Sequence, residues 1–302
     1  MNLPDLTGHR VIVTGANTGL GYASTVALAG AGAEVVLAVR DPAQGVAARQ
    51  RVRDQHPAAR LEVAHLDLAD LASVGRFAQE QVARGPLDLL INNAGLMLVP
   101  GRQRTRDGFE LQMGVNHLGH YALTAQLMPA LRQGKRARVI SLSSLAHRMT
   151  SHLDPRLGTV GPYAAMNNYA QSKLACALFG FELDRRLKAA GSPMLSVVAH
   201  PGYVATKLFS RQPNPSLADR LTSVLTPVVG SRPRHGALSQ LWAATDPHLR
   251  GGELIGPRFL MRGRPTQQPA GPNAVDRGAA ELLWDLSASL TRVAFDLHSA
   301  RR

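Results

Sequence analysis

Short apolar runs alternate with amphipathic stretches along this chain. Most of the apolar runs are continuous, as expected for strands covered on both faces of a parallel sheet. We interpret seven runs as strands: Arg10–Thr14, Glu34–Val39, Arg60–Leu66, Leu87–Asn92, Arg138–Ser143, Leu195–Ala199 and Glu253–Ile255. Helical patterns lie between them, at Gly21–Ala31, Pro42–His56, Leu71–Ala83, Phe109–Leu131, Tyr169–Ala189 and Arg234–Ala244. This alternation predicts an α/β fold with a doubly wound parallel sheet of about seven strands and helices on both faces.

No linker divides the chain, so the pattern predicts a single domain over residues 1–302. Residues 145–168 and 203–235 are long, irregular connections, and long loops in compact domains are usually functional. We expect both to line a substrate pocket. Residues 262–302 are expected to form a C-terminal extension, with a loop over 262–278 and a last helix that packs "AAELLWDLSASL" against the body.

Composition and charge exclude several classes of protein. The formal net charge of +13 is scattered along the chain. No zinc-ligand spacing or aromatic RNA-binding run accompanies it, so we expect no nucleic-acid partner. The single cysteine, Cys176, cannot form an intramolecular disulfide and is expected to be buried between its alanine neighbours. No apolar run reaches transmembrane length, and the N-terminus lacks a signal-peptide core, so a cytoplasmic protein is expected.

The first predicted strand runs into three glycines in "VIVTGANTGLGYAS", residues 11–24. Glycines allow a tight turn, and they let backbone N–H groups approach a pyrophosphate at the positive end of the following helix. The spacing of Gly15, Gly19 and Gly21 differs from the commoner G-x-G-x-x-G pattern. By itself the loop therefore leaves two interpretations open, a dinucleotide site and a tight turn without a ligand.

Further motifs follow in a fixed order, and together they resemble the short-chain dehydrogenases/reductases. They are "TGANTGLG", "LDLADL", "NNAG", "VNHLGHY", "SLSSLAH", "YAQSK" and "HPGYVAT". The resemblance covers about residues 8–260 and is strongest to the retinol dehydrogenase and protochlorophyllide reductase-like branch. It implies a Rossmann-type fold and an NAD(P)-dependent enzyme that interconverts an alcohol and a carbonyl by hydride transfer.

Four residues match the catalytic set of that family: Asn116, Ser144, Tyr169 and Lys173. Tyr169 and Lys173 are four positions apart and share one helix face. The resemblance makes Tyr169 the acid/base, and it makes Lys173 a ligand of the nicotinamide ribose. Ser144, rather than its neighbour Ser143, is expected to donate a hydrogen bond to the substrate carbonyl. In the family, the residue matching Asn116 holds a helix distortion and a water that links to the lysine.

The resemblance also implies a set of cofactor-binding residues around the carboxyl ends of the strands. An acid at the end of the second strand favours NAD, whereas an arginine there suits the 2′-phosphate of NADP. Arg40 holds this position and Asp41 follows it, while Asn17 and Thr18 give the glycine loop no basic residue. NADP(H) is therefore preferred and NAD(H) stays possible. The set comprises Gly15, Asn17, Thr18, Gly19, Leu20, Gly21, Arg40, Asp67, Leu68, Asn93, Ala94, Gly95, Tyr169, Lys173, Pro201, Gly202, Val204 and Thr206.

The candidate substrate pocket is largely apolar, which predicts a hydrophobic alcohol, aldehyde or ketone as substrate. The alternative is that part of this set is ordinary core. The separation between Ser144 and Tyr169 is longer than is usual in the family and matches the retinol dehydrogenase branch. The pocket set comprises Leu96, Met97, Ser144, Leu145, Tyr163, Tyr203, Leu208 and Phe209.

Three histidines near these motifs, His117, His120 and His147, lack metal-ligand spacing and supporting carboxylates, so no metal site is expected. We interpret them as a helix-face residue, a packed residue and a pocket-rim residue, respectively.

The helix that carries Tyr169 continues as "LACALFGFELDRRL", which is apolar over much of its circumference. The family pairs this helix with its symmetry mate, so a homodimer or homotetramer is expected. A second hypothesis is a non-enzymatic NAD(P)-binding regulatory or scaffold protein, as in family members that have lost the tyrosine or lysine. The presence of all four catalytic residues favours the enzyme.

Overall fold

A computed structural model describes residues 2–202 and 233–297 of the chain. Its strands form one eight-stranded sheet in the order β3-β2-β1-β4-β5-β6-β7-β8. The first seven strands are parallel neighbours. They are β1 Arg10–Thr14, β2 Glu34–Val39, β3 Arg60–His65, β4 Leu89–Asn92, β5 Arg138–Leu142, β6 Leu195–Ala199 and β7 Leu254–Pro257. The doubly wound parallel sheet is thus confirmed, with its switch point between β1 and β4.

An eighth strand, β8 (Pro265–Gln268), pairs antiparallel with β7 at the sheet edge. The prediction of a loop throughout residues 262–278 is therefore wrong. The sequence of β8 is "PTQQ", which begins with proline and lacks the apolar run of a central strand. Only an edge strand tolerates such a sequence, and the hydrophobic pattern does not reveal it.

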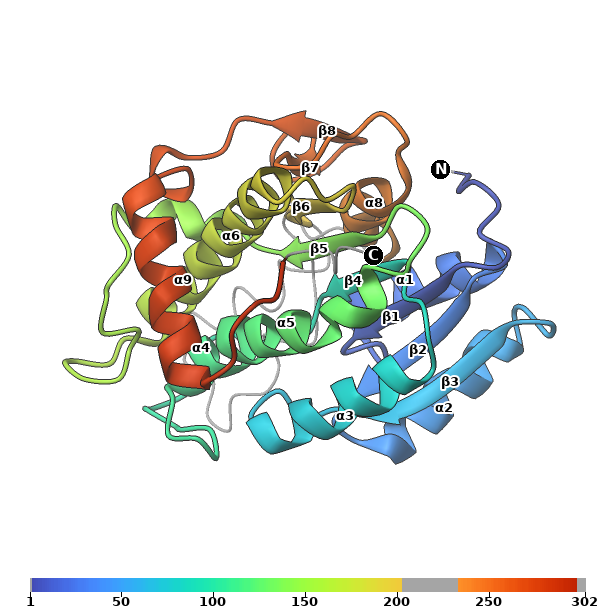
Figure 1. Cartoon of the computed structure of the whole chain (residues 1–302), viewed down its shortest axis with the longest axis horizontal. Helices are drawn as coiled ribbons and strands as arrows, with labels where there is room; N and C mark the ends of the chain where they lie inside the picture. Colours follow the sequence, from blue (N-terminus) through green and yellow to red (C-terminus); the bar gives the residue numbers. More distant parts are fainter. Residues whose placement is uncertain (1, 203–232, 298–302) are drawn as a thin grey trace, which may run out of the picture.

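Helices cover both faces of the sheet (Figure 1). On one face, α1 (Gly19–Gly30), α2 (Pro42–Arg53) and α8 (Pro233–Thr245) share a core with Val11 and Val13 of β1. On the other face, α3 (Leu71–Ala83), α5 (Gly119–Leu131) and α6 (Ala165–Ala189) pack against Ile12. Successive strand residues point to opposite faces, so a strand covered on both sides must be apolar at every position.

The long middle helix predicted over Phe109–Leu131 is interrupted. A short helix, α4 (Leu111–Met113), leads into a π-helical turn, η1 (Gly114–Leu118), and α5 follows it. Asn116 lies within the π turn, where the resemblance implied a distortion. A π turn adds a residue to the helical turn and often marks a functional site.

The last helix, α9 (Arg277–Thr291), packs along α6, as expected for the C-terminal extension (Figure 1). Trp284 of α9 stacks on Phe179 of α6 at a ring-centre distance of 6.0 Å, and Phe295 lies 4.5 Å from Trp284. Much of the apolar circumference of α6 is therefore covered within the chain, including Cys176, whose burial is confirmed. This surface does not by itself require a partner, and the homodimer or homotetramer stays a prediction.

Candidate active site

The loop after β1 is shaped by the absence of side chains. Gly15 and Gly19 adopt φ values of +65° and +56°, in the left-handed region that favours glycine. A Cβ on Gly21 would lie 2.3 Å from the carbonyl oxygen of Gly15, and a Cβ on Gly15 would lie 3.1 Å from Ala94. The loop therefore packs backbone to backbone against the turn after β4, and no larger residue fits at Gly21.

The N-terminus of α1 is open toward this loop. Its N-cap residue, Thr18, makes no side-chain capping bond, and the first turn holds no acidic residue. By contrast, Asp41, Asp70 and Asp276 cap α2, α3 and α9. Free N–H groups at the positive end of a helix form an anion site. These features fit the pyrophosphate of a dinucleotide, as the glycine motif predicts.

A hydrogen-bond network ties the end of β1 to the turn after β4. The Thr14 hydroxyl oxygen accepts bonds from the backbone N–H groups of Asn93 and Ala94, both at 2.9 Å. The His120 Nδ1 atom lies 3.0 Å from the carbonyl oxygen of Asn116. A carbonyl only accepts, so Nδ1 carries the proton, and Nε2 accepts from the Thr14 hydroxyl at 2.9 Å.

Burial lowers the pKa of His120 to about 4, which keeps the ring neutral and this arrangement intact near pH 7. His120 was expected to be packed, and it is buried. Sequence reasoning missed its bond to Thr14. The available signal was a threonine that ends an apolar strand directly before the glycine loop.

Asn116 joins this turn to α6, the helix that carries Tyr169 and Lys173. Its Oδ1 accepts from the Leu96 N–H at 2.7 Å, and its Nδ2 donates to the Leu96 carbonyl at 2.9 Å and to the Ser172 hydroxyl at 2.8 Å. A Cβ on Gly95 would lie 3.1 Å from Asn116 Oδ1 and 3.4 Å from Lys173 Nζ. The structure thus brings Asn116, Gly95 and Lys173 together.

Tyr169 and Lys173 lie side by side on α6, with exposed fractions of 9% and 5%. Lys173 Nζ donates to the Leu142 carbonyl at 2.9 Å and lies 6.0 Å from the centre of the Tyr169 ring. An ammonium has three donors, so two remain for a ligand. Among the described residues, none hydrogen-bonds the Tyr169 hydroxyl. A free phenol therefore stands beside a buried ammonium.

The two serines after β5 differ in what their hydroxyls do. Ser143 is buried, and its Oγ donates to the Lys173 carbonyl at 2.7 Å. Ser144 is partly exposed, and its Oγ accepts from the Ala146 N–H at 3.2 Å as the N-cap of a 3₁₀ turn, η2 (Leu145–Met149). A hydroxyl that accepts still has its hydrogen to donate. The geometry favours Ser144 over Ser143, although its role toward substrate stays a prediction.

The predicted pocket residues are brought together only in part. Met97 packs against a small cluster that contains Tyr169, and Leu96 and Leu145 are half-buried. The Tyr163 hydroxyl is engaged, because it donates to the Val99 carbonyl at 2.6 Å. Burial raises the pKa of Tyr163, with the Glu110 carboxylate adding to the effect. The remaining pocket and cofactor candidates, Tyr203, Val204, Thr206, Leu208 and Phe209, lie outside the described residues.

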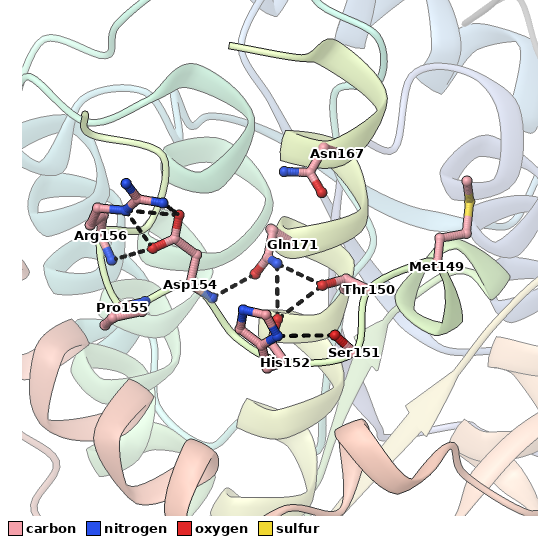
Figure 2. A pocket seen from close by; sticks show the side chains of 9 residues that line it. All are labelled: Met149, Thr150, Ser151, His152, Asp154, Pro155, Arg156, Asn167 and Gln171. Carbon is pink, nitrogen blue, oxygen red and sulfur yellow. Dashed lines mark hydrogen bonds and ion pairs between the residues drawn. The ribbon is translucent and has the colours of Figure 1, made fainter. Parts of the chain in front are cut away.

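The segment 145–168 borders a hollow of about 580 Å³, shown in Figure 2. Gln171 holds its rim: Oε1 accepts from the Asp154 N–H, and Nε2 donates to the Thr150 hydroxyl and the His152 carbonyl. Gln171 lies two positions after Tyr169, so the two side chains leave α6 on opposite faces. The hollow is therefore separate from the space beside the Tyr169 hydroxyl.

His117 and His147 are also deeply buried. His117 is only 1% exposed, its Nε2 lies 2.7 Å from the Ser287 hydroxyl of α9, and burial lowers its pKa to about 3. His147 is fully buried, so the prediction of a pocket-rim residue is wrong. Its Nδ1 lies 2.6 Å from the Ser144 carbonyl, which turns the ring inward. Within residues 2–202 and 233–297, no group of three His, Cys, Asp or Glu could hold a metal ion.

Arg40 and Asp41, the two residues after β2 that could determine the preference for NADP or NAD, have different surroundings. Asp41 Oδ1 accepts from the N–H groups of Ala43 at 2.9 Å and Gln44 at 3.3 Å, so its carboxylate caps α2. Arg40 is exposed at the carboxyl edge of the sheet. In the same region, Asp67 accepts from the Ala69 N–H at 3.0 Å, and Leu68 is buried.

Comparison with known proteins shows which family this chain resembles. The family model for short chain dehydrogenases matches residues 9–215. Polyprenol dehydrogenase of Mus musculus is 40% identical over 297 residues, covering 96% of this chain and 85% of that protein. Retinol dehydrogenase 13 of Homo sapiens is 37% identical over 291 residues, covering 94% and 85%. A crystal structure of an uncharacterised protein from Mycobacterium paratuberculosis has a TM-score of 0.80 and 39% identity, covering 98% and 97%.

A glycine loop at the switch point of a doubly wound sheet, with a Tyr–Lys pair facing the turn after β4, defines a nucleotide-dependent oxidoreductase. The chain belongs to the short-chain dehydrogenase family, and it is an NAD(P)-dependent oxidoreductase. The resemblance to the retinol dehydrogenase branch is confirmed. No helix in the described parts of the chain is both long and apolar enough to cross a membrane. The cytoplasmic location stays a prediction.

Proposed function

We propose that this oxidoreductase interconverts an alcohol and a carbonyl on a hydrophobic small molecule, with NADP(H) as cofactor and Tyr169 as the acid/base. One observation carries the proposal: the Tyr169 hydroxyl is free of hydrogen bonds to described residues and lies beside the buried Lys173 ammonium. Ser144 complements it with a hydroxyl that retains a hydrogen to donate.

In the reductive direction, the carbonyl carbon gains a hydride and the carbonyl oxygen gains a proton. The nicotinamide, when bound, supplies the hydride. The Tyr169 O–H group gives its proton to the oxygen, and Ser144 donates a hydrogen bond to the same oxygen as negative charge develops there. The Lys173 ammonium then balances the charge of the phenolate. In oxidation each proton moves in reverse, and Tyr169 accepts the proton of the alcohol.

The positioning of these groups follows from Asn116 and Ser143. Asn116 fixes Leu96 through two bonds and also donates to Ser172, so the turn after β4 and the catalytic helix are held at one separation. Ser143 fixes the backbone of Lys173 from the β5 side. Neither side chain needs to contact the substrate to determine where Tyr169 stands.

The proposed preference for NADP(H) rests on Arg40 and Asp41. Asp41 is committed to two backbone N–H groups of α2 and is poorly placed to select ribose hydroxyls, whereas Arg40 is exposed. Arg40→Asp is expected to weaken NADPH binding by about tenfold or more, because charge-assisted bonds to phosphate are the stronger kind. Calorimetric titration with NADPH and NADH measures this. An unmoved NADPH affinity would contradict the role of Arg40.

The proposal of a hydrophobic substrate rests on three apolar side chains. Met97 packs against the cluster that contains Tyr169, Leu96 precedes Met97, and Leu145 follows Ser144 in the sequence. Two relatives are named for the alcohols polyprenol and retinol. We expect kcat/KM for aldehydes to rise with the apolar size of the substrate, measured by NADPH consumption with a series of straight-chain aldehydes. A protein that reduced open-chain sugars and rejected the longer aldehydes would contradict this proposal.

A further inference from the structure

Arg51 of α2 lies against the glycine loop, although it is far from that loop in sequence. Its Nη2 donates to the Asn17 carbonyl at 3.0 Å, and its guanidinium carbon lies 4.5 Å from the centre of the Tyr22 ring. Gln55, one helical turn on, donates from Nε2 to the Tyr22 hydroxyl at 3.1 Å and to the Arg51 carbonyl at 2.9 Å. Tyr22 of α1, itself bonded by Gln55 just after α2, thus holds a guanidinium against the glycine loop.

The location of Arg51 is set by the direction of helix side chains. Side chains lean toward the N-terminus of their helix, and α2 begins just after Arg40 at the carboxyl edge of the sheet. Arg51 lies near the C-terminal end of α2, so its side chain leans back in the direction of that edge, and its bond to Asn17 shows that it reaches the glycine loop. In the register of β1 and β2, Thr14 pairs with Ala38. Continuing this register places Arg40 next to the start of the glycine loop, whose Asn17 accepts the bond from Arg51.

Neither Arg40 nor Arg51 is paired with a carboxylate among the described residues. None of the salt bridges between described residues involves Arg40 or Arg51. The nearest carboxylate in sequence to Arg40, that of Asp41, caps α2, and Asp54 accepts from Gln50 Nε2. Arg51 is exposed, and among the described residues it donates to two groups, the Asn17 carbonyl and, at 3.4 Å, the Ala47 carbonyl. A guanidinium has five N–H donors, so most of its donors remain for an anion.

We infer that Arg51 is a second cationic contact for the 2′-phosphate of NADP(H) and determines cofactor preference together with Arg40. The inference rests on the NADP(H) preference proposed above. The loop residues Asn17 and Thr18 carry no charge, and α2 supplies the missing cation from outside the glycine motif. Tyr22 is the platform: a guanidinium stacked on a ring face keeps its planar fork oriented, and a phosphate binds that fork through two parallel bonds.

The test uses the full chain and four ligands: NADPH, NADH, adenosine 2′,5′-bisphosphate and adenosine 5′-monophosphate. For Arg51→Ala, we expect the Kd of NADPH and of the bisphosphate to rise by about tenfold or more, with less than about a twofold change for the two ligands without a 2′-phosphate. Arg53→Ala is the matched control, because it removes an exposed arginine from the same helix. It should leave all four affinities unchanged.

Arg51→Lys separates charge from geometry. Lysine keeps the charge but loses the planar fork and its stacking, so the NADPH affinity should fall between those of the wild type and Arg51→Ala. Equal weakening of NADPH and NADH by Arg51→Ala would overturn the inference, because Arg51 would then only support the Asn17 carbonyl. An unchanged NADPH affinity would overturn it as well.

The same titrations distinguish failure of this inference from failure of the proposed function. If the wild type prefers NADPH and Arg51→Ala keeps that preference, only the proposed role of Arg51 is rejected. A wild-type protein without a preference for NADPH removes the proposed cofactor, and the inference falls with it.

Discussion

The loop after β1 and the segment after β5 both leave the carboxyl edge of the sheet, yet they are built in opposite ways. Residues 15–21 take their shape from missing side chains: positive φ at Gly15 and Gly19, and no room for a Cβ at Gly21. Residues 144–164 are held by side-chain bonds from distant elements. Tyr163 reaches Val99, and Arg102 donates to the carbonyl oxygens of Thr159 and Gly161.

This difference matches the ligands that we propose for the two regions. A backbone cradle suits a pyrophosphate, which is the same in every dinucleotide. A segment outside the sheet that is held by side-chain hydrogen bonds can change its contacts without altering the sheet. This suits a substrate that differs between relatives. Changes at the first loop should therefore affect cofactor binding, and changes near the second should affect turnover.

The sharpest separation between the two regions is expected at Tyr169, which we propose acts in proton transfer and which lies outside the glycine loop. Tyr169→Phe removes the proposed proton donor, so kcat should fall by about 10²–10⁴-fold while NADPH binding is retained. Single-turnover kinetics and titration measure the two quantities. The control is Tyr121→Phe, since the buried Tyr121 hydroxyl has no partner among the described residues. Turnover that survives in Tyr169→Phe would reject Tyr169 as the acid/base.

The next largest effect is expected at Ser144, the first residue of the segment 144–164. Ser144→Ala should lower kcat by about 10²–10³-fold, the cost of losing one donor to a developing oxyanion. Ser143→Ala should mainly lower the free energy of unfolding, by about 0.5–1.5 kcal/mol, because it removes one buried hydrogen bond to the Lys173 carbonyl. Steady-state kinetics and urea unfolding of both variants give the comparison. A reversed pattern would exchange the roles of the two serines.

A smaller effect, of the opposite kind, is expected at Gly21. A methyl group there meets the Gly15 carbonyl at 2.3 Å. Such overpacking costs about 1–3 kcal/mol, so Gly21→Ala should raise the Kd of the cofactor by roughly 10–100-fold. Gly75→Ala on α3 is the control, since its nearest neighbour is the flexible end of Gln126 at 3.5 Å. Unchanged cofactor affinity in Gly21→Ala would mean that the loop does not contact the pyrophosphate.

The smallest effect on cofactor binding and turnover is expected from three buried histidines, which act on the stability of the fold instead. Burial lowers the pKa of His120, beside Thr14, and of His200, after β6, to about 4, and that of His117 to about 3. The unfolded chain binds more protons below about pH 6.5, so stability is lost as pH falls from there toward 4. Each histidine contributes at most about 1.4 kcal/mol per pH unit.

Urea unfolding at pH 7, 6 and 5 measures this loss of stability. Replacing His117 with glutamine should make the decline with pH shallower, whereas the exposed His248→Gln should not alter it. A free energy of unfolding that stayed constant from pH 7 to pH 5 would show that these histidines are protonated without cost.

Features that depend on one continuous stretch of residues could be predicted from the sequence alone. The seven parallel strands are predictable because burial on both faces makes each an apolar run, and the glycine loop because its φ values require glycine. Tyr169 and Lys173 are predictable as a pair because four residues on a helix bring side chains together.

Other features depend on contacts between distant parts of the chain. The polar β8 is a strand only because the β7 edge lies next to it. The bond between Thr14 and His120 and the bond from Arg51 to Asn17 join residues with no pattern in common. The apolar circumference of α6 does not by itself require a dimer, because Trp284 of the same chain covers part of it.

The packing of α9 on α6 also has a consequence for biosynthesis. A ribosome completes α6, with Tyr169 and Lys173 in place, well before it translates Trp284. Until then, Tyr121 and Phe179 lack their aromatic cover, so the nascent polypeptide exposes a hydrophobic surface of the kind that chaperones bind. The packing of α6, which carries Tyr169 and Lys173, is therefore completed only after α9 has been synthesised.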